Sequence, residues 1–181
     1  MRILPIALTN RAASDKRLVE LAIRASSLTH RHPRSTVTCA VYVLIARALL
    51  MGNLERSRVL EQALHGVKPH LRAAELAELK VLEGYSARAG SGYVVDCFWS
   101  AWDAFAVSDS YESSVRKAIS YGDDTDTTAA VTGGLAGIYW GLKCIPQEWI
   151  RGMRGAEIVE SLVDRLIDRD GRPSPHMEPR V

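Results

Sequence analysis

The chain has few cysteines, and the three that it has form no recognisable pattern. Cys39, Cys97 and Cys144 are odd in number, lie far apart and include no Cys-x-x-Cys pair. The sequence therefore predicts neither a structural zinc site nor a disulfide framework. We expect a reducing, cytoplasmic compartment, in which each cysteine is a small buried apolar residue.

An excess of one charge and long apolar runs are also missing. The net charge is +2, from 23 basic and 21 acidic residues, and no basic block stands out. This balance argues against a nucleic-acid partner. The longest apolar stretch, residues 39–46, ends at Arg47, well short of the ~20 residues that a membrane span needs. Pro5 interrupts the first apolar residues too early for a secretory signal, so we expect no membrane partner.

Strand-like alternation is absent, whereas helical signals recur through the 181 residues. Apolar residues repeat at helical spacing, and Pro, Gly and capping residues mark the ends of the segments. Residues 93–95, taken alone, could pass for a short strand, although a helix over 94–107 is favoured. We predict an all-α fold with a single domain over residues 1–168 and a disordered, proline-containing tail over 169–181. The predicted helices cover residues 15–27, 35–51 (capped by Ser35), 54–64, 71–87, 94–107, 109–120 (with a capping box at 109–112), 127–142 and 155–168.

The acidic segment at residues 123–128 is the strongest sign of a chemical function. It contains three carboxylates and three hydroxyls. One like-charge pair at about 4 Å and an effective dielectric near 20 costs on the order of 4 kcal/mol. A bound hard cation such as Mg²⁺, Ca²⁺ or Mn²⁺ is the simplest relief. A single Asp before a helix is more often only its N-cap, but one cap does not explain three carboxylates.

The pattern also narrows the kind of cation site. An EF-hand loop that began at Asp124 would need Gly and Glu where the chain has Ala129 and Leu135. The remaining interpretation is a short loop in which Asp124 and Asp126, in a non-helical turn, and the Thr127 hydroxyl point at one cation. The helix that follows carries glycines four residues apart on one face, which we interpret as close helix packing. These glycines are Gly133, Gly137 and Gly141.

Together these motifs resemble the ADP-ribosylglycohydrolase family. The Asp-Asp-Thr-Asp-Thr segment is followed by the small-residue run at 129–141 and by Ile-Pro-x-x-Trp at 145–149. Residues 28–33 resemble the family's Thr-His-x-His-Pro loop, and residues 91–96 resemble its Ser-Gly-Tyr loop. Residues 1–6 resemble the end of its Gly-Asn-Gly-x-x-Met-Arg-x-x-Pro segment. The resemblance covers residues 1–168 in order.

The resemblance implies an ADP-ribosyl glycosidase built as an all-α bundle with a dinuclear Mg²⁺ or Mn²⁺ site. Such an enzyme hydrolyses the bond between ADP-ribose and a protein side chain or a small molecule. By motif, Asp124, Asp126 and Thr127 would be metal ligands. A metal-activated water would be the nucleophile, and no residue is assigned as its general base.

The same resemblance implies a set of substrate contacts. His30 would approach the pyrophosphate or the ribose, and Ser91, Gly92 and Tyr93 would lie along the ADP-ribose, with the Tyr93 ring offering a face for stacking. Taken alone, His30 is more typical of a loop or a helix end, and Tyr93 is more typical of core packing.

The chain departs from the family pattern on its N-terminal side. Family members carry a Thr-Asp-Asp motif, which supplies the other side of the metal pair, and a Gly-Asn-Gly loop, and neither precedes Met1 here. The resemblance therefore implies the C-terminal part of the domain, N-terminally incomplete, with one partial metal site. We expect little activity from this chain alone. The alternative is an inactive truncated remnant, or half of a split enzyme with a complementing N-terminal half.

Overall fold

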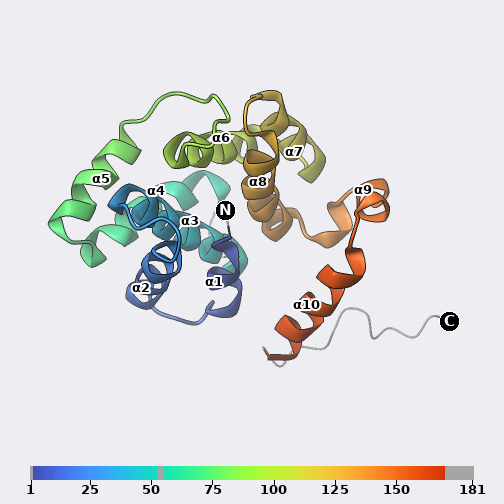
Figure 1. Ribbon diagram of the computed structural model, residues 1–181, viewed down its shortest axis with the longest axis horizontal. Coiled ribbons are helices and arrows are strands. Elements are labelled where there is room, and N and C mark those ends of the chain that lie inside the picture. Colours follow the sequence, from blue (N-terminus) through green and yellow to red (C-terminus); the bar gives the residue numbers. More distant parts are fainter. Residues whose placement is uncertain (1, 53–54, 170–181) are drawn as a thin grey trace. The chain divides into compact units, whose positions relative to one another are not determined.

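The computed structural model describes residues 2–52 and 55–169 (Figure 1). These residues contain ten α-helices, two short 3-10 helices and no strand, so the all-α prediction is confirmed. One compact unit ends at Cys144 and a second begins at Ile145. The elements are α1 (Leu4–Thr9), α2 (Asp15–Ser26), α3 (Pro33–Met51), α4 (Arg56–Val67), η1 (Lys68–His70), α5 (Ala73–Glu83), α6 (Val94–Val107), α7 (Tyr111–Ser120), α8 (Thr125–Trp140), η2 (Leu142–Cys144), α9 (Gln147–Gly152) and α10 (Ala156–Arg169).

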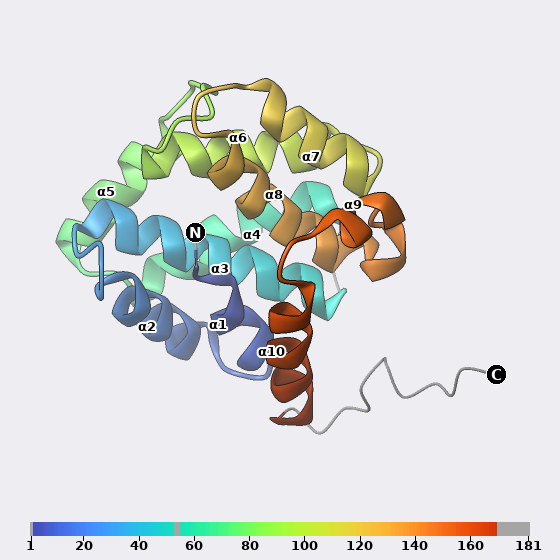
Figure 2. The same ribbon diagram turned by 45° about the vertical axis from the view of Figure 1, so that its right-hand side comes forward.

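The central element of the first unit is α3. It begins at Pro33, whose fixed φ suits a first helical position, and it ends at Gly52 in a left-handed conformation. Helices α1, α2, α4, α5, α6 and α8 all pack against it. Figure 2 shows α3 running between α1 and α2 on one side and α6 and α8 on the other.

Among the described residues, α3 is also the one helix that is long and apolar enough to cross a membrane. However, 61% of this stretch is buried inside the structure. A helix that contacts neighbours all round must be apolar on every face, so packing alone accounts for its composition.

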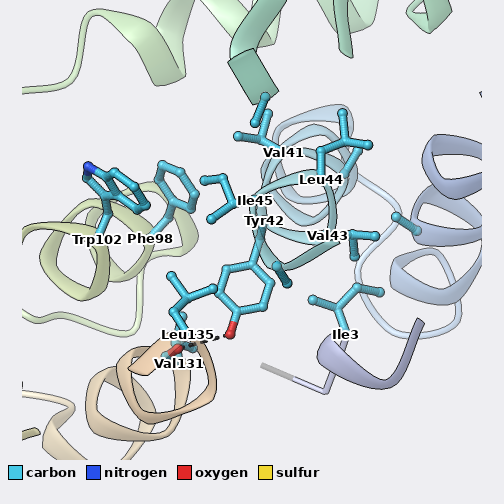
Figure 3. Packing of buried hydrophobic residues seen from close by; sticks show 14 of the residues in the cluster. Ile3, Val41, Tyr42, Val43, Leu44, Ile45, Phe98, Trp102, Val131 and Leu135 are labelled. Atoms are coloured by element: carbon cyan, nitrogen blue, oxygen red, sulfur yellow. Dashed lines mark hydrogen bonds between the residues drawn. The ribbon is translucent and has the colours of Figure 1, made fainter. Parts of the chain in front are cut away.

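Tyr42 fixes α8 against α3. Its ring lies in the core, and its hydroxyl donates a hydrogen bond to the carbonyl of Val131 in α8, at 2.9 Å (Figure 3). Gly134 makes this approach possible, because a Cβ there would lie 2.8 Å from the Tyr42 hydroxyl and 2.9 Å from Leu4 Cδ2. Burial of the phenol raises the pKa of Tyr42, which keeps the hydroxyl protonated as a donor.

The predicted close packing along the glycine face of α8 is confirmed for two of its three glycines. A Cβ at Gly133 would lie 3.3 Å from the Tyr111 hydroxyl, and one at Gly137 would lie 3.9 Å from the Tyr111 ring. Gly141 has a different role, since it follows the last residue of α8 with φ +83°. The first two glycines therefore bring α7 and α8 together, and the third ends α8.

Several helix boundaries differ from the predictions. The cap of α3 is His32, whose ring accepts the Arg34 N–H at 3.2 Å, and Ser35 lies within the helix. The capping box of α7 joins Ser110 and Ser113. The helix predicted over 71–87 is shorter, because α5 ends at Glu83. The six-residue helices α1 and α9 were not predicted.

The predicted burial of the cysteines is only partly correct. All three are free; Cys97 is buried and Cys39 is half-buried, but Cys144 is exposed. Cys144 ends the short η2 helix that follows α8, and its thiol is exposed there. The prediction of a buried thiol is therefore wrong at this position.

The second unit contains α9 and α10, which are separated by Gly155 with φ +74°. Helix α10 matches the helix predicted over 155–168, and it ends at Arg169. The rest of the predicted tail, residues 170–181, lies outside the described residues. The single domain over residues 1–168 stays a prediction.

Candidate functional site

A cleft of about 610 Å³ lies in the first unit, where the N-terminal ends of α3, α6 and α8 meet. The first turns of these helices carry backbone N–H groups without helical partners and the positive end of the helix dipole. The ends of α3 and α6 favour an anionic ligand, whereas the end of α8 carries the carboxylates of the acidic turn. The walls of the cleft include Arg2, His30, Arg34, Gly92, Tyr93, Asp124 and Thr127.

The structure gathers most of the predicted site residues at this cleft. Two of the seven, Ser91 and Asp126, do not line it. The five that do line it are His30, Gly92, Tyr93, Asp124 and Thr127. The substrate-binding and metal-binding predictions thus fall on one surface, although their residues come from three different segments of the chain.

The acidic segment forms a tight turn that leads directly into α8. Gly122 and Asp123 both adopt positive φ, +81° and +52°, and Asp124 follows as the N-cap. Helix α8 begins at Thr125, earlier than predicted, so Asp126 lies in its first helical turn. The prediction that Asp126 occupies a non-helical turn is therefore wrong. An acidic side chain there is favoured by the helix dipole, which compensates part of the charge repulsion.

Hydrogen bonds hold Asp124 in its ionised form. The Thr127 hydroxyl donates the hydrogen bond that contributes most, and it holds the pKa of Asp124 below its usual range; the Asp126 side chain also lies within hydrogen-bond distance of Asp124. Burial acts in the opposite direction and raises the pKa, and the Thr127 backbone N–H lowers it further. The three predicted ligands therefore do approach one another at the start of α8.

The acidic turn is attached to the Ser-Gly-Tyr loop through its backbone. The carbonyl of Gly90 accepts the backbone N–H of Asp124 at 2.9 Å and the Thr128 hydroxyl at 3.2 Å. A Cβ at Gly92 would lie 3.0 Å from Asp124 Oδ2. The missing side chain at Gly92 thus leaves room for the Asp124 carboxylate against the loop.

A buried carboxylate supports the loop from behind. Asp96, which is fully buried, accepts hydrogen bonds from the Ala89 N–H (2.9 Å), the Ser91 N–H (2.6 Å) and the Ser91 hydroxyl (2.8 Å). The Tyr85 hydroxyl adds a longer one, at 3.3 Å. Burial alone would raise the pKa of Asp96, but these hydrogen bonds outweigh it and hold the pKa below its usual range. Ser91 faces Asp96, so its direct contact with substrate stays a prediction.

Comparison with known proteins identifies the family. The model of the ADP-ribosylglycohydrolase family matches residues 1–175. The chain belongs to the ADP-ribosylglycohydrolase family. It is 28% identical, over 92% of its length, to the ADP-ribosyl-[dinitrogen reductase] glycohydrolase of Rhodospirillum rubrum, of which it covers 54%. It is 26% identical, over 82% of its length, to the ADP-ribosylarginine hydrolase Tri1 of Pseudomonas putida (strain GB-1), of which it covers 39%.

A solved structure supports the same fold. The ADP-ribosylglycohydrolase-related protein complex aligns with 90% of this chain at a TM-score of 0.71 and 30% identity, and 56% of that chain is covered. The chain thus spans about half the length of the relatives that it matches. The resemblance found in the sequence motifs is therefore confirmed.

Two residues at the site of this family member were given no role from the sequence. Arg34 lines the cleft and Asp96 organises the loop beside it. Arg34 directly follows the Thr-His-x-His-Pro motif, and Asp96 is the one acidic residue in the otherwise apolar first turns of α6. For Asp96, the sequence signal was a charged residue within a segment that is otherwise apolar and therefore expected to be buried.

The acidic turn offers oxygen donor atoms, the type of ligand that suits a hard divalent cation. Asp124 and Asp126 supply carboxylates and Thr127 a hydroxyl, which are the oxygen ligands that Mg²⁺ and Mn²⁺ prefer. Within residues 2–52 and 55–169, no group of three or more His, Cys, Asp or Glu side chains is placed to hold a metal ion. The turn therefore fits one side of a coordination shell that normally has six positions.

Proposed function

We propose that the cleft binds an ADP-ribosyl group and that the chain takes part in hydrolysis of the glycosidic bond to that group. The convergence of three helix N-termini on one cleft, with the acidic turn at the same place, is the observation that carries this proposal. Curated members of the family act on ADP-ribosylarginine and on ADP-ribosylated dinitrogen reductase. An ADP-ribosylated protein is accordingly the proposed substrate class.

The cleft offers complementary groups for each part of ADP-ribose. The diphosphate is anionic and suits the helix N-termini together with the side chain of His30. The Tyr93 ring, 40% exposed at the cleft wall, offers a stacking face for the adenine. The ribose next to the scissile bond would then lie toward Asp124 and Thr127.

The acidic turn would act on the ribose end of the ligand. Asp124 is ionised, and its backbone N–H is fixed on Gly90, so its carboxylate is an acceptor already in place for ribose hydroxyls. Asp124, Asp126 and Thr127 are also the residues that would hold Mg²⁺ or Mn²⁺. Such an ion, when bound, lowers the pKa of a water ligand and stabilises negative charge. Other ligands and the general base are not assigned within this chain.

A second function, binding without hydrolysis, is favoured by the limited donor set. Two carboxylates and a hydroxyl supply only part of a divalent ion's shell, and a weakly held ion does not fix a water in an attacking position. Under this interpretation the chain is a remnant, or a half that needs a complementing half. Catalysis would then appear only when further ligands are added.

Binding and release can be measured separately on the same protein. We expect ADP-ribose to bind the chain in the presence of Mn²⁺, as measured by calorimetry. Asp124→Asn should weaken this binding by about 10-fold or more, because it removes an anionic ligand from the acidic turn. Release of free ADP-ribose from an ADP-ribosylated arginine protein, assayed with and without Mg²⁺ or Mn²⁺, then separates hydrolysis from binding alone.

The matched control is Asp123→Asn, which removes one negative charge from the same turn. Asp123 is exposed and does not line the cleft, and asparagine tolerates its positive φ. Its affinity for ADP-ribose should stay within about twofold of the unchanged chain, a small surface-charge effect. Absence of ADP-ribose binding to the unchanged chain, or equal weakening by both substitutions, would contradict the proposed function.

A further inference from the structure

Arg34 joins three parts of the first unit at the edge of the cleft. It lies in the first turn of α3, and its Nε donates to Glu78 Oε2 on α5 at 2.6 Å. Its Nη1 donates to the hydroxyl of Tyr93, the N-cap of α6, at 2.9 Å. The partners lie 44 and 59 residues away in the chain, so this link exists only in the folded structure.

Glu78 and Arg34 differ in their access to a ligand. Arg34 lines the cleft, whereas Glu78 does not, and the Glu78 side chain is only 19% exposed. Glu78 therefore holds the guanidinium from the side away from the cleft. The two hydrogen bonds leave Arg34 little freedom, because both the Nε edge and the Nη1 edge of the planar group are engaged.

The Tyr93 ring is positioned by its edges. The Arg34 guanidinium carbon lies 6.0 Å from the ring centroid while Nη1 contacts the hydroxyl, which places the guanidinium beyond the hydroxyl end of the ring. Tyr85 makes a T-shaped contact with a centroid separation of 5.9 Å. Tyr93 as a residue remains 40% exposed and lines the cleft, so it stays available to a planar ligand group.

We propose that Glu78 is a positioning residue that acts through Arg34 to fix the Tyr93 ring for stacking against the adenine base. This inference rests on the proposed function, because it concerns the base of the same ADP-ribosyl ligand. A tyrosine ring that is already immobilised loses less conformational entropy when the base stacks on it. Glu78 should therefore contribute to affinity for the base and not to affinity for the phosphate or ribose.

The test compares ligands with and without the base. Dissociation constants for ADP-ribose and for ribose 5-phosphate, which keeps the terminal ribose and its phosphate but lacks the whole adenylate half with the base, would be measured for the unchanged chain and its variants. Glu78→Gln and Tyr93→Phe, which keeps the ring but removes the hydroxyl, should each weaken ADP-ribose binding about fivefold. Affinity for ribose 5-phosphate should not change. The control is Glu83→Gln, since Glu83 also lies on α5 but pairs with Lys68 and does not line the cleft.

Each outcome decides the matter. Equal weakening of both ligands would mean that Glu78 supports the cleft as a whole, and unchanged or tighter ADP-ribose binding in Glu78→Gln would mean that Glu78 does not position the ring. Either result overturns the inference and leaves the proposed function in place. Failure of the unchanged chain to bind ADP-ribose would overturn both. A loss confined to the base-containing ligand in both variants, and absent from the control, supports the inference.

Discussion

Asp96→Asn is expected to lower the free energy of unfolding by about 3 kcal/mol, although it changes a single atom. Oδ1 of Asp96 accepts the Ala89 N–H, and Oδ2 accepts the Ser91 N–H. An amide has one acceptor and one donor end, so in either orientation its NH₂ faces a backbone N–H. The backbone donor that loses its partner then faces the amide of a side chain that is fully buried, and an unpaired donor there costs free energy.

Thermal or urea unfolding measures this effect directly. For a chain of this size, about 3 kcal/mol corresponds to a fall in Tm of roughly 10 °C. The matched control is Asp109→Asn, where the carboxylate accepts an exposed hydrogen bond from Ser113. That change should cost less than about 0.5 kcal/mol, as for other surface substitutions. Equal losses in the two variants would show that Asp96 does not support the fold in this way.

The pH dependence of the same pair supplies an independent check. The pKa of Asp96 is lower in the folded than in the unfolded chain. The stability that the Asp96 carboxylate contributes is therefore fully present above the pKa of an aspartate in the unfolded chain, about 4. It is lost as the pH falls through the still lower folded pKa. The difference in unfolding free energy between the unchanged chain and Asp96→Asn should therefore be constant near neutral pH and shrink below about pH 4. A difference that does not change with acid would contradict the lowered pKa.

The helices could be predicted from sequence where periodicity and end signals agree. Helices α2 to α8 all lie close to predicted segments, because each buries apolar residues at helical spacing, although α4 and α6 have no side-chain cap. The six-residue α1 and α9 are too short to show a period. Pro5 occupies the first turn of α1, which begins at Leu4, and its missing N–H costs nothing there.

The candidate site was predictable where local sequence carries the chemistry. Asp124 and Thr127 could be placed at the candidate site because an excess of oxygen ligands in one turn is visible in the sequence. The orientation of Ser91 could not be predicted from sequence. It depends on a hydrogen bond to Asp96 in α6, and that bond exists only in the folded chain. Arg34 was missed because its partners are distant in sequence and meet it only after α3, α5 and α6 pack.

Gly90→Ala is the other change from which we expect a large effect, a loss of about 3 kcal/mol or more in unfolding free energy together with displacement of the acidic turn. Gly90 is buried and has φ +69°, and a Cβ there would lie 2.7 Å from Tyr121 Cβ and 2.9 Å from the Gly122 carbonyl oxygen. These atoms belong to the chain path itself and not to a flexible side-chain end. The two loops would have to separate, which breaks the hydrogen bond between Gly90 and Asp124.

Gly122→Ala distinguishes this close approach from backbone strain. Gly122 has φ +81°, but no heavy atom lies within 4 Å of the position that its Cβ would take. Alanine there should incur only the cost of the left-handed conformation, about 1 kcal/mol. Unfolding measurements on both variants therefore isolate the contact between the loops, and ADP-ribose titration of both shows whether that contact sets the position of Asp124. If the two alanines cost the same free energy, the approach of Gly90 to the acidic turn does not hold the site together, and the carboxylate must be positioned by α8 alone.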